Sequence, residues 1–460
     1  MQLPSIAEAS RAIAERRLSP VALAEACLAR IAAAEPKLNA FIKLTPDAAM
    51  SAAREAEADI NAGRYKGPLH GIPFAHKDIY ATAGVATTAH SRLLENNVPK
   101  ESAFTVEKLA AAGVLPFGKL ATHEFAWGGP SFDLPWPPAR NPWNPEHFPG
   151  GSSSGTGAAV AAGFVLGGTG SDTGGSIRLP AAYCGLAGIK PTYGLLSRYG
   201  IQPLAFTLDH AGPLAWTVED CAILLEAMAG HDPRDPASVN TPSPELRKRL
   251  DTGIAGLRVG VVRHFFEHDT PIAPEVGAAM SQSIRVLETL GAKVADATLP
   301  PLQDWASAGM LIMIAEAYAV HEPWVKTRYN DYGELFRDRV VMGAFISSGD
   351  YLAAVRMRRE LRTALAAEMQ KYDVLILPTV PTPAPRMEAV TKYGGFEVPN
   401  FTMPFNVAGT PALSICNGYS AGGLPLALQI VGRPFEDATV LAVGHTYERA
   451  TDWRSRRPRL

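Results

Sequence analysis

The spacing of apolar and polar residues predicts three helices in the first part of the chain. Ser19 and Thr45 each stand immediately before a proline. A hydroxyl followed by proline is a common helix start, because the hydroxyl caps free backbone N–H groups and proline fits the first turn. Gly63 is expected to end the third helix, since glycine is frequent just past a helix end. The chain is therefore expected to begin with a helical segment over about residues 1–65.

Further along, the pattern moves between the periods typical of strands and of helices. We predict strands over 256–262 and 292–299, a helix over 274–290 that ends at Gly291, and a buried strand over 372–379. This alternation favours an α/β fold with a central mixed β-sheet covered by helices on both faces. No repeat or linker divides the chain, and 232–252 is interpreted as a surface connection. We expect one large domain over 1–460, with the N-terminal helical segment packed on it.

The composition is that of a globular protein with a large core. Hydrophobic residues make up 47% of the 460 residues and charged residues 19%, and Lys+Arg 43 nearly balances Asp+Glu 45. This balance argues against a disordered chain and against a surface that binds nucleic-acid phosphates. The sequence has neither a signal-peptide pattern nor the ~20 consecutive apolar residues of a membrane span. The expectation is a cytoplasmic protein that binds neither membranes nor nucleic acid.

Metal-binding and redox patterns are weak. The four cysteines are far apart and form no CxxC pair, which is typical of a reducing compartment. His264 and His268 are four residues apart but lack acidic residues at helical spacing. We therefore predict no metal and no cofactor.

Two glycine turns that carry a serine form the densest motif. Residues 150–152 and 174–176 both read Gly-Gly-Ser, and between them lies a segment of small residues that we predict to include a helix packed against a sheet. Successive N–H groups of such a turn can point into one concavity and bind negative charge, as an oxyanion hole requires. A phosphate-binding loop is excluded because no Lys-Ser or Lys-Thr follows the glycines, and the dinucleotide motif also fails. A structural loop is the alternative for either turn taken alone.

The run resembles the signature sequence of the amidase signature family of serine hydrolases. The matching positions are Gly150, Ser152, Gly155, Asp172, Gly174, Ser176, Arg178 and Pro180. An upstream block, 71–80, matches the family block that carries a lysine, here Lys77. Ser152 follows Lys77 by 75 positions and Ser176 follows Ser152 by 24, as the family's catalytic residues do. The segments 184–200, 208–215 and 424–437 also resemble family blocks, so the resemblance covers nearly the whole chain.

The resemblance implies a catalytic trio in which Ser176 is the nucleophile, Ser152 the bridging serine and Lys77 the base. It also implies a cis peptide before Ser152, an oxyanion hole around Thr173, Gly174 and Gly175, and supporting roles for Ser153, Asp172 and Arg178. A serine needs a partner that takes its proton, and a buried lysine without a carboxylate partner can be neutral near pH 7. The neighbouring Asp78 must therefore point away. His76 and His147 are near these blocks but lack the Ser and Asp pattern of a histidine triad.

The segment 125–145 resembles the family loop on the acyl side of the pocket. It is richer in aromatic residues than the loop of the A-type chains of glutaminyl-tRNA amidotransferases. The resemblance implies substrate contacts from Trp127, Gly128, Phe132, Leu134 and Trp136. Those A-type chains carry an aspartate that contacts the amino group of glutamine, where this chain has Pro399. Glutamine is therefore expected to be a poor substrate.

We hypothesise an enzyme that hydrolyses amides through an acyl-enzyme. The first hypothesis is a free-standing amidase, a monomer or homodimer, acting on small apolar or aryl amides and extending to carbamates or esters. The alternatives are an amidotransferase A-type subunit that works with partner chains on aminoacyl-tRNA, and a ureido- or biuret-type amidohydrolase. A non-enzymatic relative is disfavoured because all three catalytic positions are filled.

Overall fold

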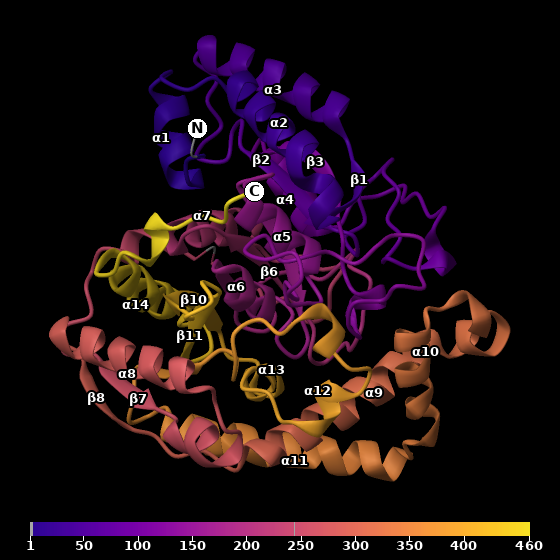
Figure 1. Cartoon of the computed structure of the whole chain (residues 1–460), viewed down its shortest axis with the longest axis vertical. Coiled ribbons are helices and arrows are strands. Elements are labelled where there is room, and N and C mark those ends of the chain that lie inside the picture. The colour runs from indigo at the N-terminus through magenta and orange to yellow at the C-terminus, as the bar shows by residue number, and fades with distance from the viewer. Residues whose placement is uncertain (1–2, 243) are drawn as a thin grey trace.

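The fold is built on one mixed sheet of 11 strands in the order β1-β3-β2-β4-β6-β5-β10-β11-β9-β7-β8 (Figure 1). The computed structural model describes residues 3–242 and 244–460. The strands are β1 (Phe41–Leu44), β2 (Pro73–Lys77), β3 (Leu115–Leu120), β4 (Gly167–Asp172), β5 (Ala187–Lys190), β6 (His210–Ala215), β7 (Arg258–Val261), β8 (Lys293–Asp296), β9 (Val374–Pro378), β10 (Ala412–Tyr419) and β11 (Pro425–Gly432). The strands predicted over 256–262, 292–299 and 372–379 are confirmed as β7, β8 and β9.

The sheet combines parallel and antiparallel pairs. β2 runs parallel to both β3 and β4, and β7 runs parallel to both β8 and β9. Between these two blocks the pairs are antiparallel, from β4 and β6 through to β11 and β9. The predicted mixed sheet is confirmed.

The three N-terminal helices are confirmed as α1 (Ile6–Ala14), α2 (Pro20–Leu38) and α3 (Pro46–Asn61). Ser19 caps α2, because its hydroxyl accepts a hydrogen bond from the N–H of Ala22. Thr45 precedes α3 without capping it, and its hydroxyl donates instead to the carbonyl of Pro116 in β3. α2 packs on α3, and α3 packs on β3, so this segment covers one end of the sheet (Figure 1, indigo).

Helices cover both faces of the sheet. The remaining α-helices are α4 (Phe104–Ala111), α5 (Ser154–Ala162), α6 (Arg178–Cys184), α7 (Val218–Met228), α8 (Pro274–Thr289), α9 (Leu302–Thr327), α10 (Glu334–Val340), α11 (Ser348–Glu368), α12 (Gly394–Glu397), α13 (Met403–Ala408) and α14 (Asp437–Arg449). A Cβ added at Gly188 of β5 would meet Ala181 of α6 at 2.7 Å. Ser414 of β10 pairs with Gly188 and shares its face, whereas Leu413 points to the opposite face, where it meets α14. The predicted α/β layering is confirmed.

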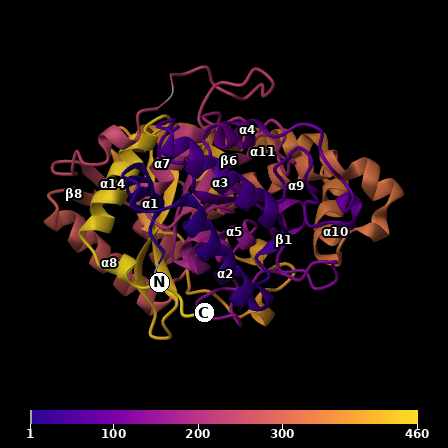
Figure 2. The same cartoon turned by 90° about the horizontal axis from the view of Figure 1, so that it is seen from above.

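The helices α9, α10 and α11 occupy the side of the molecule away from the N-terminal helices (Figure 1, orange). α9 packs along α11 and also contacts α10 and α13. The segment 232–252 connects α7 to β7, and its described residues arch over the surface in Figure 2. In the described part of the chain, no helix combines the length and the apolar character that crossing a membrane requires.

Candidate active site

The sheet brings the lysine and the two serine turns to one edge. β2 ends at Lys77 and the parallel strand β4 ends at Asp172, so both carboxyl ends lie at the same edge. The second glycine turn follows β4 directly and leads into α6. The first glycine turn leads into α5, which packs on β4 and α6. Three segments far apart in the sequence therefore meet in one place.

The amine of Lys77 lies in a buried chamber that is formed by three serine hydroxyls. Its Nζ donates to Ser152 Oγ at 2.7 Å, to Ser171 Oγ at 2.9 Å and to Ser153 Oγ at 3.1 Å. The side chain is fully buried, and this burial lowers the pKa of Lys77 to about 7, although Asp172 and Asp209 act in the opposite direction. A large fraction of Lys77 is therefore neutral near pH 7.

The carboxylate of Asp78 points away from this chamber. It accepts hydrogen bonds from the N–H and the hydroxyl of Thr88, at 3.0 and 2.5 Å, and lies 3.6 Å from Lys119 Nζ. It thus forms its ion pair with Lys119 and does not hold Lys77 in the charged form.

The first glycine turn is held tightly between its neighbours. The peptide bond between Gly151 and Ser152 is cis, as the resemblance implied. A Cβ at Gly151 would collide with the imidazole of His123, and one at Gly150 would lie 2.6 Å from the backbone nitrogen of Pro180. Gly150 also has a φ of 81°, which favours glycine. Both positions therefore need glycine.

Ser176 lies half-buried at the edge of a cavity, directly before α6. Its carbonyl accepts from the N–H of Ser153 at 3.2 Å, which ties the two serine turns together. Within residues 3–242 and 244–460, no hydrogen bond joins the hydroxyls of Ser176 and Ser152. Catalytic hydrogen bonds often tighten only when substrate is bound.

The backbone N–H groups of the second turn differ in their partners. The N–H of Gly175 donates to Asp172 Oδ1 at 2.7 Å, so it is already engaged. The N–H groups of Thr173 and Gly174 make no hydrogen bond to any described residue, and both residues line the cavity. The predicted set of three donors is thereby reduced to two that are available.

Asp172 and Arg178 form the buried support of this turn. Arg178 donates to Asp172 through Nε at 3.0 Å and Nη2 at 2.8 Å, and both side chains are fully buried. Burial opposes the carboxylate, but Arg178 and the side-chain amide of Asn406 hold the pKa of Asp172 well below its usual range. Arg178 also donates to the carbonyl of Thr402 and to Gln429, so the pair links the turn to α13 and β11.

A cavity of about 370 Å³ opens above Ser176. Trp127 and Gly128 line it, as the resemblance implied. The other lining is mostly apolar and comes from outside the predicted loop, from Phe148, Leu179, Tyr183, Met310, Met313, Phe396 and Met403.

Phe132, Leu134 and Trp136, which were also predicted to contact the substrate, do not line this cavity. Phe132 is 66% exposed, Leu134 is buried against Gly333, and Trp136 packs its ring edge-on to His90. Gly128 is the last residue of the segment 125–145 that lines the cavity, and the apolar residues after it pack elsewhere or face solvent.

Two residues that the sequence patterns did not indicate line the cavity. Arg339 of α10 is 5% exposed, donates to the carbonyls of Lys392 and Gly128, and pairs with no carboxylate among the described residues. His123 has a buried Nε2 without a partner, and burial holds its pKa well below the usual value, so its imidazole is neutral. His123 lies two residues before the segment 125–145, and this closeness to the predicted loop could have indicated it as a cavity residue. Arg339 lies in a segment without any motif.

The histidines singled out from the sequence are not in the catalytic chamber. His76 is buried between the rings of Phe74 and Tyr80, and His147 Nδ1 donates to the carbonyl of Ala384 at 2.7 Å. Across the described residues, no three His, Cys, Asp or Glu side chains gather as a metal ion would need.

These features define an enzyme of the amidase-signature class, and the chain belongs to the Amidase family, which is recognised over residues 22–441. The chain is 42% identical to the A-type subunit of the glutamyl-tRNA(Gln) amidotransferase from Chloroflexus aurantiacus, over 99% of this chain and 98% of that protein. A solved structure of a vestigial protein complex, described as revealing the evolutionary origins of an s-triazine catabolic enzyme, matches with a TM-score of 0.91 and 32% identity, over 97% and 98% of the two chains. A bacterial aryl acylamidase of the family matches with a TM-score of 0.88 and 26% identity, over 98% and 97%.

Proposed function

We propose that the chain hydrolyses amides through an acyl-enzyme formed on Ser176. The observation that carries this proposal is the position of Lys77, which is fully buried, contacts three serine hydroxyls and is 2.7 Å from Ser152 Oγ. A neutral amine in this position is a suitable base for a serine.

In the proposed cycle, protons pass along the three catalytic residues. Ser176 turns towards Ser152 and gives it a proton as Ser152 gives its own to Lys77, and the Ser176 oxygen attacks the amide carbon. The N–H groups of Thr173 and Gly174 stabilise the oxyanion. Ser152 then gives its proton to the leaving nitrogen and takes one back from Lys77 as the C–N bond breaks, so Lys77 is neutral again. Water then attacks the acyl carbon, passes its proton to Lys77 through Ser152, and the acyl group leaves as the acid while Ser176 regains its proton by the same route.

The role of Lys77 predicts the pH dependence of the reaction. Only the neutral amine accepts a proton, so kcat/KM is expected to rise with pH through a midpoint at about 7 and to level off above it. The rate is measured between pH 5 and 9 on a primary amide. Lys77→Met is expected to be nearly inactive across this range, and a variant that kept the wild-type profile would contradict the assignment.

The cavity supports a substrate that carries a carboxylate. Arg339 is a buried guanidinium at the cavity without an acidic partner, and such a group is stabilised when a ligand supplies the negative charge. The name of the Chloroflexus relative favours glutamine as the amide, and with it the amidotransferase A-type alternative that works with partner chains. Pro399 offers no acidic side chain to the α-ammonium group of glutamine. We therefore propose small amides with a carboxylate, with or without an α-amino group, and this replaces the expectation from the sequence that glutamine is a poorer substrate than an apolar amide.

A second candidate is the free-standing amidase for apolar or aryl amides, which the aromatic and methionine lining of the cavity favours. Three substrates separate the candidates: glutamine, glutaramate, which lacks the amino group, and acetanilide, which lacks the charge. We expect glutaramate to equal or exceed glutamine, and both to exceed acetanilide at least about tenfold in kcat/KM. Arg339→Met is expected to lower kcat/KM for both carboxylates about a hundredfold and to change that for acetanilide little. Acetanilide as the best substrate by a hundredfold would favour the second candidate.

A further inference from the structure

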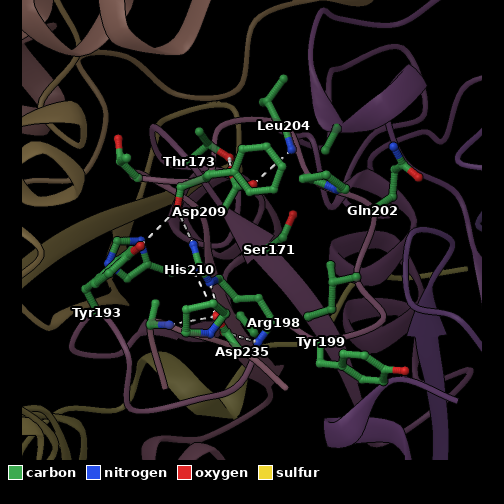
Figure 3. Close-up of a pocket in the computed structure, with 18 of the residues that line it drawn as sticks. Ser171, Thr173, Tyr193, Arg198, Tyr199, Gln202, Leu204, Asp209, His210 and Asp235 are labelled. Carbon is green, nitrogen blue, oxygen red and sulfur yellow. Dashed lines mark hydrogen bonds and ion pairs between the residues drawn. The ribbon is translucent and has the colours of Figure 1, made fainter. Parts of the chain in front are cut away.

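A second and larger cavity lies beside the substrate cavity. Figure 3 shows this cavity, which measures about 540 Å³. Ala126, Thr173 and Leu204 line both cavities. The first cavity extends from Ser176 towards Trp127 and Arg339, whereas the second extends towards the segment 193–211 and the loop at 234–237. Thr173, whose N–H is one of the proposed oxyanion donors, therefore lies between the two cavities, and the substrate proposed above occupies only the first of them.

The second cavity reaches the catalytic groups through two hydroxyls. Ser171 lines it, and Ser171 Oγ accepts from Lys77 Nζ at 2.9 Å. Thr173 Oγ1 donates to Asp209 Oδ1 at 2.6 Å, and Asp209 also lines this cavity (Figure 3). A ligand in the second cavity would thus contact Ser171, which is bonded to the base, and Thr173, which supplies one oxyanion donor.

One buried hydrogen-bond acceptor in the lining of the second cavity, His210 Nε2, receives no hydrogen bond. His210 Nδ1 lies 2.7 Å from the carbonyl of Leu208, which can only accept, so Nδ1 carries the hydrogen. The opposite nitrogen, Nε2, is then an acceptor, and it is buried without a partner. His210 is 3% exposed and lies beside Asp209 in the lining (Figure 3). Both oxygens of Asp209 already accept hydrogen bonds, from Thr173, Leu204 and Ala205, so His210 Nε2 is the acceptor that favours a ligand with an N–H group.

The two arginines of the lining give little reason to expect an anion as the ligand, because carboxylates already balance their charges. Arg234 binds Asp232 at 2.9 Å and Glu107 at 3.2 Å. Arg198 binds Asp235 through Nε at 3.2 Å and Nη2 at 3.1 Å, so its charge is already balanced. The remaining lining includes apolar and aromatic side chains, Ile201, Leu204 and Phe206. A neutral N–H donor with an apolar substituent fits these surroundings best.

We propose that the second cavity binds the amine side of the substrate, meaning the N-substituent of a secondary amide and, after cleavage, the amine product. This inference rests on the proposed amide hydrolysis. When the C–N bond breaks, Ser152 supplies the proton, the acyl group stays on Ser176 in the first cavity, and the amine remains in the second. The enzyme would then accept N-substituted amides as well as primary amides.

The test compares two substrates with the same acyl group, glutaramate and its N-benzyl amide. We measure the ratio of kcat/KM for the N-benzyl amide to that for the primary amide. Ile201→Trp, which fills the second cavity, is expected to lower this ratio at least about thirtyfold. The matched control Val98→Trp adds the same ring at an exposed position outside both cavities and is expected to leave the ratio unchanged. An equal ratio in wild type and Ile201→Trp would overturn the proposal.

A binding measurement keeps the proposal testable if Ile201→Trp does not fold. Benzylamine binding to the wild-type protein is measured by calorimetry at pH 10, where much of the amine is neutral, and His210→Phe is expected to weaken it about tenfold because the acceptor is lost. Binding that is absent, or unchanged by His210→Phe, would overturn the proposal. These results are distinguishable from a failure of the proposed amide hydrolysis, because in that case the wild-type protein would not hydrolyse the primary amide either.

Discussion

Replacing Ser176 by alanine is expected to lower kcat/KM for amide hydrolysis about a thousandfold or more while leaving the fold intact. The substitution removes the attacking oxygen, and the serine hydroxyls that remain near it, those of Ser152, Ser153 and Ser171, are bonded to Lys77 Nζ. The Ser176 hydroxyl makes no hydrogen bond to any described residue, so its loss should cost little stability. Steady-state rates on a primary amide and the Tm of both proteins measure the two effects.

The outcome that would contradict this assignment is specific. If Ser176→Ala kept more than about a thousandth of the wild-type rate with an unchanged Tm, the nucleophile would be another group. A lower Tm together with the loss of activity would instead mean that the turn had been disturbed.

Replacing Ser152 by alanine is expected to be nearly as damaging, with a loss of about a hundredfold to ten-thousandfold in kcat/KM. Ser152 Oγ lies 2.7 Å from Lys77 Nζ, and without it the lysine has no path to the proton of Ser176. The loss is expected mainly in kcat, because Ser152 transfers protons in both chemical steps.

Ser154→Ala is the matched control for this variant. Ser154 belongs to the same run of serines and is 4% exposed, close to the 2% of Ser152, but its hydroxyl is not among those that accept a hydrogen bond from Lys77. Its substitution is expected to change kcat less than threefold. Equal effects of the two substitutions would mean that Ser152 acts through packing and not through proton transfer.

The catalytic residues were predictable from the sequence because local features fix them. The two glycine turns admit few other residues, as the collision of a Cβ at Gly151 with His123 illustrates. Lys77 closes a strand whose parallel neighbour leads into Ser176, so the sheet register brings them together. The N-terminal helices were predictable for a similar reason, since Ser19 and the proline after it determine a helix start within a few residues.

The substrate cavity was less predictable because tertiary packing builds it. Arg339 reaches the cavity from α10, more than 160 residues after Ser176, and only its burial without an acidic partner marks it. Apolar character alone did not show which residues of the loop face the substrate. Trp127 lines the cavity, whereas Trp136 packs on His90, although both are tryptophans in one aromatic segment.

If Ser176 carries the acyl group of the substrate, the covalent intermediate can be trapped on this residue. The enzyme is mixed with a p-nitrophenyl ester, quenched in acid during turnover, digested, and mapped by mass spectrometry. We expect one acyl group per chain, attached to Ser176, in the wild-type protein and none in Ser176→Ala. An acyl group on Ser152 or on another residue, or turnover without any acylated peptide, would contradict it.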